Sequence, residues 1–130
     1  MTFRTLLIVK AVVCLVFGAF LLVAPSVLLG ILGANLSAGG MFTGREYGAA
    51  LIGILLLAWF AKNVKAADAR GAILLQLLVY DAIGMIVTLR VVVSGVLNAL
   101  GWGIVAVYAF FAAGSGYLLI REKPFRRAQA

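Results

Sequence analysis

The residue best placed to do chemistry in this sequence is Asp81, an acid within a long apolar stretch. No other charged residue lies between Arg70 and Arg90. In a helix rising 1.5 Å per residue, Asp81 would lie near the middle of a membrane, where an ionisable group is costly and usually has a partner or a function. Such a carboxyl can hold a structural ion pair, or exchange a proton or cation during transport.

A second polar group, Arg45, Glu46 and Tyr47, begins another apolar segment. Arg90 is a poor partner for Asp81, because it lies on the opposite side of the helix and about 13 Å further along its axis. We expect the long Arg45 side chain to reach inward and meet Asp81, directly or through water. The candidate polar constellation comprises Arg45, Glu46, Tyr47, Tyr80, Asp81 and Asn98.

Two interpretations of this constellation stay open. In the first, a buried ion pair and its hydrogen bonds fix the register of the helices, and Asn98 caps the start of the last long helix. In the second, the same polar side chains, Asn98 apart, line a cavity that opens to the outside, where Asp81 receives a proton or a ligand. The residue types alone fit both interpretations.

The elements that must position these residues are membrane spans. Of the 130 residues, 65% are hydrophobic and 12% are charged, and the mean hydropathy is +1.19, more apolar than a soluble domain of this size can bury. A helix that crosses a membrane needs roughly 20 apolar residues. We therefore predict an all-α polytopic membrane protein with one four-helix bundle domain over residues 1–130, short loops, and spans at about 6–24, 42–61, 71–90 and 97–120.

The positive charges predict the orientation of these spans. If both termini are cytoplasmic, only Arg45 and Arg90 lie outside, as the positive-inside rule favours. The inside set is Arg4, Lys10, Lys62, Lys65, Arg70, Arg121, Lys123, Arg126 and Arg127. The basic tail 121–127 is expected to lie against anionic headgroups. The N-terminus and the C-terminus are therefore expected to be cytoplasmic.

Pro25 marks the end of the first span. It follows directly after Ala24, where a signal peptide would have to be cleaved, so we expect the span to be retained. Proline also ends or bends a helix, and residues 26–32 are expected to form a short apolar helix at the outer interface.

Small residues four positions apart predict where helices approach closely. They occur in the second and fourth spans, and the helix they face could belong to the same chain or to another protein. The lipid bilayer is the first expected partner, and nucleic acid is not expected. A protein partner or a second copy would dock through the faces Gly44, Gly48 and Gly53 or Ala109, Ala113 and Gly116.

The residue inventory disfavours familiar enzyme chemistry. The chain has no histidine and one cysteine, Cys14, which excludes a histidine base or ligand, a disulfide framework and a redox cysteine pair. We predict no catalytic residue, no metal ligand and no cofactor. An enzyme acting on a lipid or a quinone, with Asp81 or Glu46 as acid or base and Tyr47 or Tyr80 as donor, is the least favoured function.

The segments 45–50 (REYGAA), 81–84 (DAIG) and 98–102 (NALGW) resemble small four-helix bacterial membrane proteins that are loosely DoxX-like. The resemblance covers the whole chain as a pattern of spans. It implies a helical bundle in a bacterial inner membrane and no particular chemistry. The positions it picks out are Arg45, Tyr47, Gly48 and Asp81.

Two functions lead from this sequence. The first is a non-catalytic structural or accessory component of a membrane, favoured by the short loops, the small-residue faces and the missing catalytic groups. The alternative is a small oligomeric transporter or channel that uses the buried acid Asp81.

Overall fold

The computed structural model describes residues 1–128, a part of the chain that contains six helices and no strand. The long helices are α1 (Phe3–Val23), α3 (Ala38–Ala61), α4 (Ala67–Val93) and α5 (Gly101–Glu122), and the short ones are α2 (Pro25–Ile31) and α6 (Pro124–Ala128). Four helices are long and apolar enough to cross a membrane, so the predicted all-α transmembrane bundle is confirmed. Residues 129–130, at the end of the predicted domain, lie outside the described part.

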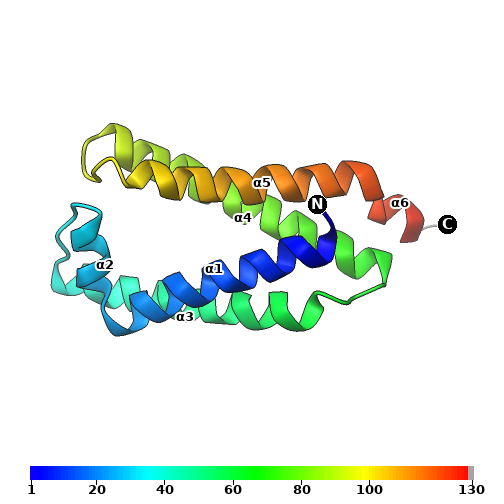
Figure 1. Ribbon diagram of the computed structural model, residues 1–130, viewed down its shortest axis with the longest axis horizontal. Coiled ribbons are helices and arrows are strands. Elements are labelled where there is room, and N and C mark those ends of the chain that lie inside the picture. The colour runs from blue at the N-terminus through cyan, green and yellow to red at the C-terminus, as the bar shows by residue number, and fades with distance from the viewer. Residues whose placement is uncertain (129–130) are drawn as a thin grey trace.

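The long helices form two antiparallel pairs (Figure 1). α1 packs mainly on α3, and α4 packs mainly on α5. One end of the molecule carries α2 and the turn between α4 and α5, and we call it the α2 end. The opposite end carries the N-terminus, the loop 62–66 and α6, and we call it the α6 end. The fold therefore depends on whatever joins one pair to the other.

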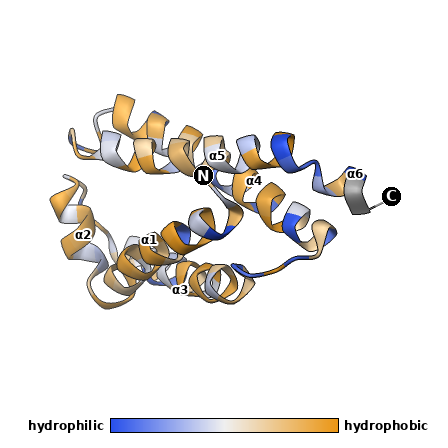
Figure 2. Cartoon of the chain, turned by 45° about the vertical axis from the view of Figure 1, so that its right-hand side comes forward, coloured by the Kyte–Doolittle hydropathy of each residue, from blue (hydrophilic) through white to orange (hydrophobic). Residues whose placement is uncertain are grey.

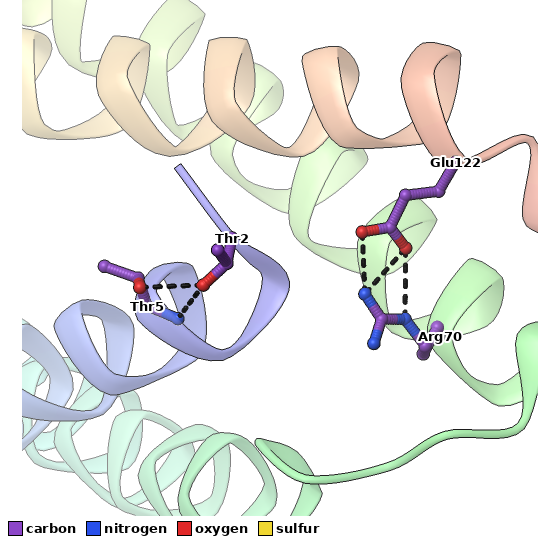
Figure 3. Close-up of polar contacts among 4 residues, drawn as sticks. All are labelled: Thr2, Thr5, Arg70 and Glu122. Atoms are coloured by element: carbon purple, nitrogen blue, oxygen red, sulfur yellow. Dashed lines mark hydrogen bonds and ion pairs between the residues drawn. The ribbon is translucent and has the colours of Figure 1, made fainter.

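Side-chain caps and proline define several helix ends. The Thr2 hydroxyl accepts a hydrogen bond from the Thr5 N–H at 3.2 Å, which caps the start of α1 (Figure 3). Ser37 caps α3 in the same way, through the Gly40 N–H at 3.2 Å. Such caps satisfy N–H groups that have no partner within the helix. Pro25 separates α1 from α2 and is the first residue of α2, as proline geometry favours.

Several helix ends differ from the predicted spans, whereas α3 ends at Ala61 as predicted. α3 begins at Ala38 instead of residue 42, because Ser37 supplies the cap. α4 extends to Ala67 and Val93, beyond the 71–90 stretch, because its charged ends are also helical. α5 begins at Gly101 instead of residue 97, because the residues before it form a turn in which Gly95 adopts φ +76°. Hydropathy marks the membrane boundary, whereas capping and turns set the helix ends.

Large apolar side chains are exposed on the outer faces of the long helices. On α1, Val12, Leu15 and Val16 are each at least half exposed, and on α4, Ile83 and Val87 are too. Hydrophobic residues run along all the long helices, while hydrophilic residues gather near the α6 end (Figure 2). Faces this apolar are suited to lipid, and the chain is a multi-pass membrane protein.

Gly48 lets α1 and α3 approach closely. A Cβ atom at Gly48 would lie 2.9 Å from the Gly18 carbonyl oxygen and 2.9 Å from the Leu22 backbone nitrogen, so this small-residue face is used within the chain. Gly53 lies five residues further along α3, and a Cβ atom added there would lie in open space. The two glycines form a natural pair of test positions.

We expect Gly48→Ala to lower the stability of the bundle by about 1–3 kcal/mol, because the new methyl group meets backbone that cannot move independently. Gly53→Ala should raise stability by about 0.5–1 kcal/mol, because it only restricts the unfolded chain. Thermal unfolding of both variants in the same detergent checks this. Equal effects at the two positions would mean that α1 and α3 do not meet at Gly48.

Candidate functional site

A buried ion pair joins α1 to α4. The Lys10 ammonium donates a hydrogen bond to Asp81 Oδ1 at 2.5 Å, and the two residues are only 3% and 0% exposed. The ammonium also lies 4.9 Å from the ring centroid of Tyr80 and 4.4 Å from that of Phe111, where the faces of the rings attract a cation. Each charge is thus neutralised by the other, which offsets the free-energy cost of placing both in an apolar interior away from water.

The predicted partner of Asp81 is wrong. Arg45 and Glu46 are both exposed on α3 and make no side-chain ion pair or hydrogen bond within residues 1–126. The prediction that Lys10 lies at the inside surface is also wrong, because its side chain is buried within the bundle. The signal was present in the sequence: Lys10 is a charge within the apolar stretch 6–24, and an intramembrane base and acid on different spans are natural partners.

Three tyrosine hydroxyls form a cluster beside the ion pair. The Tyr47 hydroxyl on α3 is 2.6 Å from the Tyr80 hydroxyl on α4 and 2.6 Å from the Tyr108 hydroxyl on α5. Gly84 makes room for this arrangement, since its Cβ would lie 2.5 Å from the Tyr108 ring. The structure brings together Tyr47, Tyr80 and Asp81, as the constellation requires, and adds Tyr108.

The ion pair and the tyrosine cluster both border a cavity of about 660 Å³ between the two helix pairs. The polar side chains are few, and most of the wall is apolar, with Phe17 and Leu51 from one pair and Val91 and Val107 from the other. Thr88, seven residues after Asp81 on α4, also lines it. The cavity agrees with the second interpretation for Tyr47, Tyr80 and Asp81, but Arg45 and Glu46 do not line it. The ion pair agrees with the first interpretation, with Lys10 in the place of Arg45.

Asn98 fastens the two helix pairs at the α2 end. Its backbone N–H donates to the Leu32 carbonyl at 2.8 Å, and its side-chain Nδ2 donates to the Ile31 carbonyl at 2.8 Å. Its Oδ1 accepts from the Leu100 N–H at 3.0 Å, so Asn98 orders the turn that leads into α5. The predicted capping role is wrong, because α5 begins at Gly101 with Leu100 as its N-cap and no side-chain cap hydrogen bond. The link to α2 was not predictable from local sequence.

A second ion pair lies at the α6 end and is far more accessible. Arg70 of α4 binds Glu122 of α5 through two nitrogens, with distances of 2.6, 2.7 and 3.0 Å (Figure 3). The Arg70 guanidinium also lies 4.2 Å from the Phe3 ring centroid, which adds a contact to α1. The basic end of α5 therefore stays attached to α4. The side chain of Arg127, part of the predicted basic tail, lies outside the described residues.

The chemistry available to the site is proton donation, hydrogen bonding and charge pairing. Among the described residues, no three His, Cys, Asp or Glu side chains gather in a way that could hold a metal ion. Cys14 is buried and lines the cavity. The site holds one polar atom without a partner in the described chain, Asp81 Oδ2.

No family model, curated protein or solved structure matches this chain.

Loss of the Asp81 charge should destabilise the bundle strongly. We expect Asp81→Asn to cost about 3–5 kcal/mol, because it leaves the Lys10 ammonium buried without a counter-ion. The matched control is Glu46→Gln, an equivalent change at an exposed acid, for which we expect less than about 0.5 kcal/mol. Unfolding in detergent measures both. Similar losses in the two variants would show that Asp81 does not hold Lys10.

Proposed function

We propose that this protein is a non-catalytic structural or accessory component of a membrane. The observation that supports this most is the Lys10–Asp81 pair: the two intramembrane charges neutralise each other and join the helix pairs, so neither is free for catalysis. The tyrosine hydroxyls likewise bond to one another.

An accessory component needs a surface for its partner, and the structure narrows the choice. Of the six small residues predicted at docking faces, Gly48 packs on α1, and Gly44 lies against Pro25. Gly53 and Ala113 are exposed on α3 and α5. We propose that a protein partner or a second copy packs against one of these two open positions, where a small side chain permits close approach.

We also propose that the chain lies in a bacterial inner membrane with both termini cytoplasmic, as a DoxX-like protein would. The charge distribution supports the orientation. Lys10 no longer counts, since it is buried, but the α6 end still carries a large excess of positive residues, whereas Arg45 and Arg90 lie toward the α2 end. The positive-inside rule then puts the α6 end in the cytoplasm.

A second candidate function is transport by a small oligomer. The observation that favours it is the cavity, which reaches Asp81 between the helix pairs and could admit a cation or a proton to the middle of the membrane. The same Lys10 that supports a structural role opposes this one, because it already occupies the carboxylate.

Replacement of the whole pair distinguishes these two functions. In Lys10→Met/Asp81→Leu, apolar side chains fill the site of the ion pair, and such replacements are often neutral or stabilising. We expect this double variant to stay folded and to retain the stoichiometric partner subunit or second copy that native mass spectrometry finds with the wild type. Gly53→Leu blocks one of the two open positions and should lose a partner that packs there without lowering the unfolding temperature of the single chain.

Two results would contradict the accessory role. One is a wild-type protein that is monodisperse without a partner and supports proton-driven flux in proteoliposomes. The other is flux that the double variant abolishes while its fold is intact, because an architectural ion pair is dispensable once apolar residues replace it.

Cysteine labelling tests the orientation. Cys14 is buried and should not react with the label. The labelling signal then comes only from the single cysteine introduced at an exposed position, either Lys65 or Ser94. In intact cells, a membrane-impermeant maleimide should label Ser94→Cys, and it should label Lys65→Cys only after lysis. The reverse pattern would invert the proposed topology.

A further inference from the structure

The cavity between the helix pairs combines an apolar wall with a polar floor. Its volume of about 660 Å³ falls within the range of small-molecule sites, roughly 300–1,000 Å³. The floor consists of the Lys10–Asp81 pair and the three tyrosines. The rest of the lining is mostly aliphatic or aromatic, and its polar side chains are Asn35, Thr43 and Thr88. A few convergent polar groups in an apolar cavity are typical of a binding site for a small molecule.

The tyrosine cluster has one O–H donor more than its two hydrogen bonds employ. Three hydroxyls carry three O–H donors, and the two hydrogen bonds at Tyr47 use one donor each. Whichever way these two bonds are oriented, they leave the third O–H over, since each hydroxyl donates only once. All three tyrosines line the cavity, so the spare donor belongs to a side chain at its surface.

The ion pair adds to this excess of donors without adding net charge. The Lys10 ammonium has three N–H groups, of which one bonds Asp81 Oδ1, and the neighbouring rings of Tyr80 and Phe111 accept only weakly. The carboxylate neutralises the ammonium. Asp81 Oδ2 is the one acceptor there without a partner, whereas Lys10 alone keeps two N–H groups. Because donors outnumber free acceptors, the floor favours an uncharged ligand whose main polar group accepts hydrogen bonds.

The border of the cavity faces lipid. Thr43 on α3 and Val87 on α4 both line it and are both exposed, and these helices belong to different pairs. At the α2 end, Asn98 links the pairs. Access between α3 and α4 from the bilayer suits a molecule that is already dissolved in the membrane.

From these observations we infer that the cavity binds a lipid-soluble molecule with an apolar body and an uncharged carbonyl oxygen, which accepts the spare O–H of the Tyr47–Tyr80–Tyr108 cluster. This binding site goes beyond the accessory role and does not depend on a protein partner.

The test uses 2-tridecanone labelled with ¹³C at the carbonyl, and tridecane as its apolar match. We expect the full-length protein in detergent to bind the ketone about tenfold more tightly than the alkane, because one hydrogen bond to a desolvated donor is worth about that factor. Infrared difference spectra should show a carbonyl band at lower frequency than that of the ketone in micelles. The reference is Thr88→Phe, which fills the cavity from α4 and should remove both the binding and the shifted band.

The donor is identified by removal of all three hydroxyls. Any single Tyr→Phe change leaves at least one spare O–H, so the informative variant is Tyr47→Phe/Tyr80→Phe/Tyr108→Phe. It should lose the shifted band and the preference for the ketone while still binding both molecules weakly. The control is Tyr117→Phe, an exposed tyrosine on α5, which should behave as the wild type.

Several results would overturn the proposal. Equal binding of ketone and alkane without a shifted band would mean a purely apolar cavity, and binding of neither would mean a cavity occupied by water. A shifted band that persists in Thr88→Phe would place the ketone elsewhere, and this arm decides the matter even if the triple variant does not fold. Loss of the protein partner leaves all these measurements unchanged, so the two proposals fail separately.

Discussion

The Lys10–Asp81 ion pair is the constraint on which the rest of this structure depends. A charge within a bilayer costs several kcal/mol, so neither residue is tolerated unless its partner is at hand. Because Lys10 belongs to the α1–α3 pair and Asp81 to the α4–α5 pair, satisfying the charges fixes how the two pairs face each other. Packing of small residues holds α1 on α3 at Gly48, and a buried apolar cluster that includes Leu7, Leu74 and Phe111 packs between the pairs.

The cavity lies beside the ion pair, where polar side chains join the two helix pairs. Polar groups that join the helix pairs concentrate at three levels: the Asn98 link at the α2 end, the tyrosine cluster with the ion pair within the bundle, and the Arg70 contacts at the α6 end. Between the first two levels lies the cavity, with the ion pair and the tyrosine cluster at its border. The ion pair and the tyrosine cluster thus join the helix pairs and also line the cavity.

Much of the fold was predictable, because membrane spans depend on composition and length. The four long helices and the short helix after Pro25 follow from apolar runs and proline geometry. The group Tyr47, Tyr80 and Asp81 was also predictable in part, since these polar side chains must avoid lipid. Arg45 was the wrong partner for Asp81. Its position at the start of an apolar segment leaves its side chain exposed, whereas Lys10 lies deeper in its apolar stretch and is buried. Tyr108 and the Asn98 link to α2 depend on contacts between segments far apart in the sequence, which local patterns do not encode.

The most direct test of this account is the distance between the two charged groups in the membrane. Solid-state NMR dipolar recoupling between ¹⁵Nζ of lysine and ¹³Cγ of aspartate, in bilayers, measures it. The chain has three other lysines and one other aspartate, so Asp68→Asn and Lys10→Met samples assign the signal. The account predicts strong dephasing from a contact of 2.5 Å between Lys10 Nζ and Asp81 Oδ1, which disappears in Lys10→Met. Absence of dephasing in the folded wild type would contradict it.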